Sequence, residues 1–90
     1  MQEITLDFTE CKYIVQLYDI LQEGFHFPEW FGRNLDALWD LLRYYDGPPI
    51  IVKIKGIETM PKDLRSHMDE VLDVFADVHA EVPQMYFEVI

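Results

Sequence analysis

The chain is poor in cysteine and in long apolar runs, and both shortages restrict the cellular compartment in which we expect it. Cys11 is the only cysteine among 90 residues, so no disulfide can form within the chain and a reducing compartment is expected. The first ten residues, MQEITLDFTE, lack the basic and apolar regions of a signal peptide. No stretch approaches the roughly 18 consecutive apolar residues of a membrane-spanning helix. We therefore predict a cytoplasmic protein with no membrane partner.

Basic residues are scarce as well, since seven Lys and Arg stand against 17 Asp and Glu, for a formal net charge of −10. Such a charge repels nucleic-acid phosphates and attracts basic partners. Half of the residues are apolar and 14% are aromatic, which is enough apolar surface to build a core. We predict one folded domain, residues 1–90, that does not bind nucleic acid.

Motifs for catalysis and metal binding are also missing. Ser66 is the only serine, and it stands where a helix is expected to start, so a capping role is favoured over a nucleophile. His26, His67 and His79 do not have the spacing of a zinc site. The sequence contains no glycine-rich phosphate loop. We predict a protein with no catalytic residues, no cofactor and no metal.

The spacing of apolar residues predicts alternating strands and helices. Strands are expected at residues 2–8, 50–54 and 84–90, and helices at residues 13–23, about 31–45, within 56–65 and at 66–80. Each connection between strands is long enough to cross over, so the strands should form a small three-stranded parallel sheet with helices packed on it, an α/β fold. The apolar strand at 50–54 should be central in the sheet or covered on both faces.

Glycine, proline and serine mark the expected ends of the helices. Gly24 is predicted to stop the first helix. Pro61 suits the first position of the short helix within residues 56–65. Ser66 and Asp69 resemble a capping box at the start of the last helix.

The helix expected from about residue 31 to 45 has an unusual polar face. At roughly 100° per residue, the side chains expected to face the core are those of Phe31, Leu35, Leu38 and Leu42. Asp36 and Asp40, one turn apart, then face water with Arg43, and Trp39 lies at the border. Two like charges at this spacing cost a few tenths of a kcal/mol of helix stability, so folding alone does not favour the pair.

Aromatic residues surround this acidic pair, with Trp30 before the helix and Tyr44 and Tyr45 at its end. Tryptophan and tyrosine are enriched at binding hot spots, so the face is either a solvated helix surface or a protein-binding surface. A hydrolytic pair of carboxylates is disfavoured, because adjacent turns of one exposed helix provide no cleft.

The segment PEWFGRNLDALWDLL, residues 28–42, resembles the signature of the barstar family, small intracellular inhibitors of secreted ribonucleases such as barnase. The core of the match is G-x-N-L-D-A-L-W-D, from Gly32 to Asp40, and the rest of the chain agrees in outline. The resemblance implies a barstar-like fold and one-to-one inhibition of a basic microbial ribonuclease. It also implies a protein that is a monomer when free and is not an enzyme.

The resemblance further implies roles for single residues. Asp40 corresponds to the carboxylate that mimics a substrate phosphate, Asp36 to a second acid on the same face, and Trp30 to the loop that covers the nuclease active site. The expected contact surface consists of Trp30, Asn34, Asp36, Trp39, Asp40, Arg43, Tyr45 and Asp77. Asn34 has a structural alternative, since its side chain can cap the start of the helix.

Arg33 departs from the family pattern, because the best-known member carries a glutamate there. It either pairs with Asp36 three residues later, which would weaken complementarity to a basic nuclease, or it selects a different nuclease. A second function therefore stays open, namely an immunity or interaction module for a different nuclease toxin or another basic protein.

Overall fold

Three strands form one parallel sheet in the computed structural model, which describes all residues from Met1 to Ile90. The strands β1 (Gln2–Asp7), β2 (Ile50–Lys55) and β3 (Met85–Val89) lie in the order β1-β2-β3. The helices are α1 (Ile14–Phe25), α2 (Leu35–Arg43) and α3 (Lys62–Glu81), with a 3-10 helix, η1, at Ile57–Thr59. The predicted α/β fold with a three-stranded parallel sheet is confirmed.

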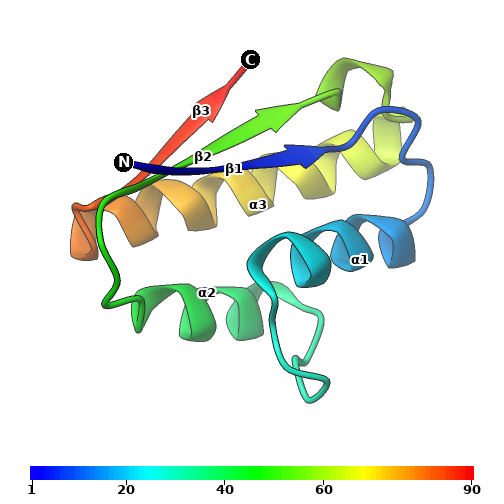
Figure 1. The fold of residues 1–90 in the computed structure, drawn as a ribbon. Helices are drawn as coiled ribbons and strands as arrows, with labels where there is room; N and C mark the ends of the chain where they lie inside the picture. Colours follow the sequence, from blue (N-terminus) through cyan, green and yellow to red (C-terminus); the bar gives the residue numbers. More distant parts are fainter.

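Both connections between strands step in the same direction across the sheet. Right-handed crossovers then place their helices on the same face, and Figure 1 shows α1, α2 and α3 on one side of the sheet. β2 is the central strand, which is the first of the two predicted alternatives. On the uncovered face, Lys53 and Lys55 pair with Glu3 and Asp7 of β1 at 3.3 and 3.8 Å.

The core lies between the sheet and the helices and contains 21 buried apolar residues in one cluster. Phe75 of α3 stacks on Phe87 of β3, with ring centroids 4.4 Å apart. Phe25 stacks on Phe27 at 5.2 Å, and Phe27 contacts Phe31 at 4.8 Å. These contacts extend the packed interior from the sheet into the segment between α1 and α2.

Gly24 does not end α1, contrary to the prediction. The helix continues to Phe25 and ends where His26 adopts a left-handed conformation with φ of 56°. A Cβ atom on Gly24 would lie 2.3 Å from Cδ2 of Leu6. This glycine therefore allows α1 to pack closely on β1, and it does not act as a stop.

The predicted start of the last helix at Ser66 is also wrong. A single 20-residue helix, α3, begins at Lys62, directly after Pro61. Pro61 was predicted to be the first residue of a short helix, but it is the cap residue that precedes α3. Ser66 lies inside this helix, and its hydroxyl contacts the carbonyl one turn earlier at 3.5 Å, so it forms no cap with Asp69. The physical reason is Leu64, which is buried and extends the apolar stripe of α3 to one turn before Met68.

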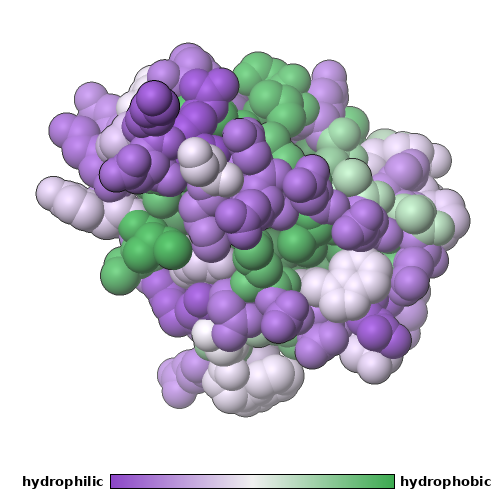
Figure 2. Space-filling view, turned by 180° about the vertical axis from the view of Figure 1, so that it is seen from behind, coloured by the Kyte–Doolittle hydropathy of each residue, from purple (hydrophilic) through white to green (hydrophobic).

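The exterior is dominated by hydrophilic side chains. Figure 2 shows them covering most of the rear face, with apolar residues visible in separate patches between them. None of the three α-helices combines the length and apolar character needed to cross a membrane.

Candidate protein-binding site

The segment between α1 and α2, residues 26–34, is a loop that projects away from the sheet (Figure 1). Its inner side is anchored by the buried Phe31 and the half-buried Phe27. The Phe31 N–H donates to the Pro28 carbonyl at 3.0 Å, which closes a turn at the tip of the loop. Trp30 lies in this turn and is 75% exposed. The anchored loop thus presents an indole ring to solvent.

Asn34 caps the start of α2, which confirms the structural role that was predicted as the alternative to contact with a partner. Its Oδ1 accepts a hydrogen bond from the Ala37 N–H at 2.8 Å, and its Nδ2 donates to the Gly32 carbonyl at 3.2 Å. The first bond satisfies one of the free N–H groups of the helix start. Contact between Asn34 and a partner stays a prediction.

The acidic pair lies on the solvent-facing side of α2. Asp36 and Asp40 are exposed, whereas Leu38 and Leu42 are buried, as the helical spacing predicted. Asp36, in the first turn, is favoured by the helix dipole, but Asp40 in the middle of the helix gains little from it. None of the three ion pairs in the protein involves either residue. Their carboxylates remain available to a cation from outside.

A recess of about 410 Å³ opens between the loop and α2, beside Asp40. It is lined by Trp30, Gly32, Ala37, Asp40, Leu41 and Tyr44. The two aromatic walls are strongly exposed, at 75% for Trp30 and 73% for Tyr44. An apolar recess with aromatic walls and one carboxylate suits a flat or cationic side chain of a partner.

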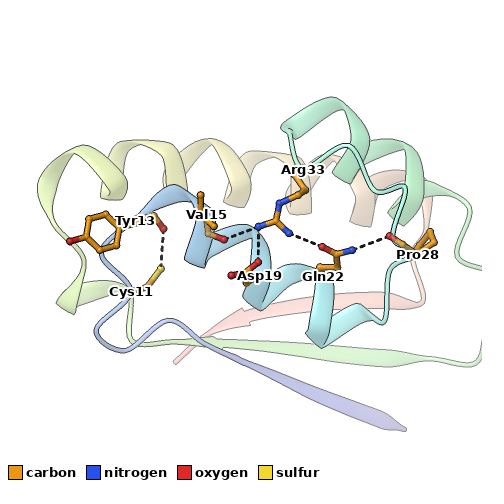
Figure 3. Close-up of polar contacts among 7 residues, drawn as sticks. All are labelled: Cys11, Tyr13, Val15, Asp19, Gln22, Pro28 and Arg33. Carbon is orange, nitrogen blue, oxygen red and sulfur yellow. Dashed lines mark hydrogen bonds and ion pairs between the residues drawn. The ribbon is translucent and has the colours of Figure 1, made fainter.

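Arg33 does not pair with Asp36, so the first of its predicted alternatives is wrong. Its guanidinium instead reaches α1, as Figure 3 shows. It donates to Asp19 Oδ1 at 2.7 Å, to the Val15 carbonyl at 2.9 Å and to Gln22 Oε1 at 2.6 Å. The positive charge of Arg33 is thus balanced by Asp19 and is not paired with the acids of α2.

Comparison with known proteins places this chain in a family. The family described as "Barstar (barnase inhibitor)" matches residues 1–89. The chain belongs to the barstar family. It is also 35% identical over 82 residues to "Putative ribonuclease inhibitor YrdF" of Bacillus subtilis (strain 168), an alignment that covers 91% of this chain and 90% of that protein. The resemblance predicted from residues 28–42 is confirmed.

The two adjacent tyrosines at the end of α2 in this barstar-family chain have different environments. Tyr45 is half-buried against the core, and its hydroxyl donates to the Pro48 carbonyl. Tyr44 is exposed, and the Arg43 guanidinium lies 5.1 Å from its ring centroid and 5.9 Å from that of Trp39. Tyr44 was left out of the expected contact surface. Adjacent residues of one type can be told apart only once the path of the chain after α2 is known.

The remaining residues of the expected barstar-type surface do not line the recess. Trp39 is half-buried on the flank of α2, as predicted. Asp36 and Asn34 line a neighbouring hollow that also contains His67. Asp77 is exposed in the last turns of α3, whose C-terminal end points to the same side of the molecule as that of α2 (Figure 1).

Several other reactive side chains of this barstar-family member make hydrogen bonds within the protein. Cys11 is buried, and this burial raises the pKa of its thiol. Desolvation also raises the pKa of Tyr18, whose hydroxyl shares a hydrogen bond with His67 Nε2 at 2.9 Å. His79 Nδ1 is 2.7 Å from the Met85 carbonyl oxygen. No group of three or more His, Cys, Asp or Glu side chains is placed to hold a metal ion.

Proposed function

We propose that this protein inhibits a ribonuclease stoichiometrically, with residues 1–90 acting as one barstar-like domain in a one-to-one complex. The free protein is a cytoplasmic monomer in this proposal. Membership of the barstar family and the similarity to the Bacillus subtilis protein support it. The observation that carries it is Asp40, an unpaired carboxylate beside a recess with Trp30 and Tyr44 as walls.

Asp40 takes the place of a substrate phosphate in the complex. A ribonuclease active site holds Arg, Lys and His side chains that bind a phosphodiester, and a carboxylate accepts charge-assisted hydrogen bonds from the same groups. Asp36 supplies a second acceptor on the same exposed face. Trp30 and Tyr44 exclude water around these contacts, which strengthens them because the local dielectric constant falls.

The net charge of −10 adds a long-range attraction to a basic nuclease. Because Arg33 is held by Asp19 on α1, it does not form the local pair that would have neutralised Asp36. The association rate should therefore be high at low ionic strength and fall as salt is added. A partner held mainly by apolar contacts would show little dependence on salt.

The direct test is a titration into a secreted guanyl-preferring microbial ribonuclease, with RNA cleavage as the readout. Cleavage should cease at a molar ratio of one to one. Full cleavage in the presence of a large excess of the protein would contradict the proposal for this nuclease class. The acidic face would then be assigned to a different nuclease toxin or another basic protein.

The residue test is Asp40→Ala, with Asp69→Ala as a matched control. Both residues are exposed acids, so both variants change the net charge equally, but Asp69 lies on α3 and lines no part of the recess. Asp40→Ala should abolish inhibition and leave the melting temperature unchanged or slightly raised, because the repulsion from Asp36 is relieved. Equal loss of inhibition in the two variants would show that only net charge matters.

A further inference from the structure

We propose that Arg33 is a positioning residue that fixes the loop to α1 before a partner binds, an inference that rests on the proposed function. The Arg33 clamp consists of Arg33, Asp19, Gln22 and the Val15 carbonyl. It holds the loop in one conformation, so that Trp30 is already in its binding position before a partner arrives. Arg33 itself does not contact the nuclease.

The contacts of the clamp follow one stripe of α1. Residues 15, 19 and 22 recur at helical spacing, and each supplies one acceptor to the guanidinium at 2.6–2.9 Å. Gln22 then connects to the other end of the loop, because its Nε2 donates to the Pro28 carbonyl at 3.0 Å. The clamp therefore fastens both Pro28 and Arg33, the residues that flank the tip of the loop (Figure 3).

The backbone at Arg33 supports a role for its side chain. The φ angle of Arg33 is 54°, in the left-handed region that residues other than glycine and asparagine seldom adopt. Backbone preference alone would place glycine or asparagine here. A residue kept in an unfavourable conformation needs a compensating interaction, and the three hydrogen bonds of the guanidinium provide it.

The position of the clamp connects it to the candidate binding site. Gly32 lines the recess and Asn34 caps α2, so Arg33 stands between the wall of the recess and the start of the acidic helix. An unfastened loop would have to be ordered at the moment of binding, which lowers affinity. In the ion pair, the side chain of Arg33 is 33% exposed and that of Asp19 is 54% exposed. Such partly exposed pairs contribute little to global stability, so the main effect should be on the loop.

The test variant is Arg33→Asn, because asparagine tolerates the left-handed backbone and cannot form the clamp. Asp19→Asn removes the negative charge from the α1 side of the clamp, which weakens its bond to the guanidinium, and should act in the same direction. Glu23→Gln is the matched control, since it removes an exposed acid from the same helix without touching the clamp. Arg33→Asn and Asp19→Asn should raise the inhibition constant about tenfold, the cost of ordering a few residues, while Glu23→Gln should not.

A second readout does not need a partner. The Phe31 N–H donates to the Pro28 carbonyl inside the loop, and the Leu38 N–H donates to the Asn34 carbonyl at the start of α2. Hydrogen exchange of the free protein should accelerate about tenfold at Phe31 and stay unchanged at Leu38 in Arg33→Asn. Unchanged exchange at Phe31, or equal acceleration at both amides with a lowered melting temperature, would overturn the proposal. If the parent protein inhibits no ribonuclease, the proposed function fails, and the exchange result still decides the clamp.

Discussion

The Tyr45 hydroxyl donates a hydrogen bond to the Pro48 carbonyl, which holds the phenol ring against the turn that leads into β2. Its neighbour Tyr44 makes no such bond and extends into solvent beside the recess. We infer that two adjacent side chains of the same type have separate tasks. Tyr45 stabilises the connection from α2 to the sheet, while its expected contact with a partner stays a prediction, and Tyr44 is exposed beside the recess.

These separate tasks predict opposite effects of substitution. Tyr45→Phe should lower the free energy of unfolding by about 1 kcal/mol, the usual net contribution of one hydrogen bond, and leave inhibition intact. Tyr44→Ala should weaken inhibition at least tenfold and change stability by less than about 0.5 kcal/mol, as is usual for exposed positions. Urea denaturation and inhibition titrations measure the two quantities. The reverse pattern would show that the assignments are exchanged.

Substitution of Asn34 separates capping from contact with a partner. Asn34→Ala should lower the free energy of unfolding by about 1 kcal/mol, because the Ala37 N–H loses its acceptor. Asn34→Ser preserves a capping oxygen and should retain most of the stability. Inhibition measured for Asn34→Ser then reports on the binding surface alone. If this variant is stable and inhibits poorly, the amide of Asn34 contacts the nuclease.

Two glycines should differ in their tolerance of alanine. Gly56 has a φ of 84°, and a Cβ atom there would lie 2.3 Å from the backbone nitrogen of Thr9. Gly56→Ala should therefore cost more than about 2 kcal/mol of stability, because neither the φ angle nor the neighbouring backbone can adjust freely. Gly24→Ala meets only the side chain of Leu6, which can rotate, and should cost less. Denaturation of both variants gives the comparison, and equal losses would contradict it.

Stability should fall in alkaline solution because of two buried acids. Burial raises the pKa of the Cys11 thiol and of the Tyr18 phenol above their ordinary values of about 9 and 10. As the pH rises past these values, the unfolded chain releases its protons first, and the folded chain retains them. The free energy of unfolding should therefore decrease from about pH 9 upward.

Urea denaturation at pH 7.5, 9 and 10 measures this decrease. Cys11→Ala should reduce the loss between the first two values, because the titrating thiol is absent. A free energy of unfolding that stays constant up to pH 10 would contradict the expected effect of burial.

The orientation of α2 could be predicted from the sequence because it depends on neighbours within one helix. Asp36 and Asp40 fall opposite Leu38 and Leu42 through the geometry of 3.6 residues per turn, wherever the helix is placed. The same holds for the alternating strand β1 and for the central apolar strand β2. Specific motifs also helped, since GRNLDALWD pointed to the family that the comparison later confirmed.

Contacts between distant residues could not be predicted in this way. A pair with Asp36, three residues away, was one of the two alternatives predicted for Arg33, but Arg33 pairs with Asp19, 14 residues away. Gly24 was interpreted as a helix stop, whereas its role is set by Leu6 on another element. Local sequence does not show which surfaces meet after folding, so neither of these two contacts could be predicted from neighbouring residues.

All but one of the candidate contact residues lie in a single stretch, residues 30–45, within the connection between β1 and β2. The two ends of this connection are fixed by adjacent parallel strands, and its inward residues, among them Phe31 and Leu38, complete the common core. The outward residues can therefore vary without altering the sheet. We therefore expect that recognition of a different nuclease would require changes mainly on the outer surface of this connection, with Asp77 of α3 as the one candidate contact residue outside it.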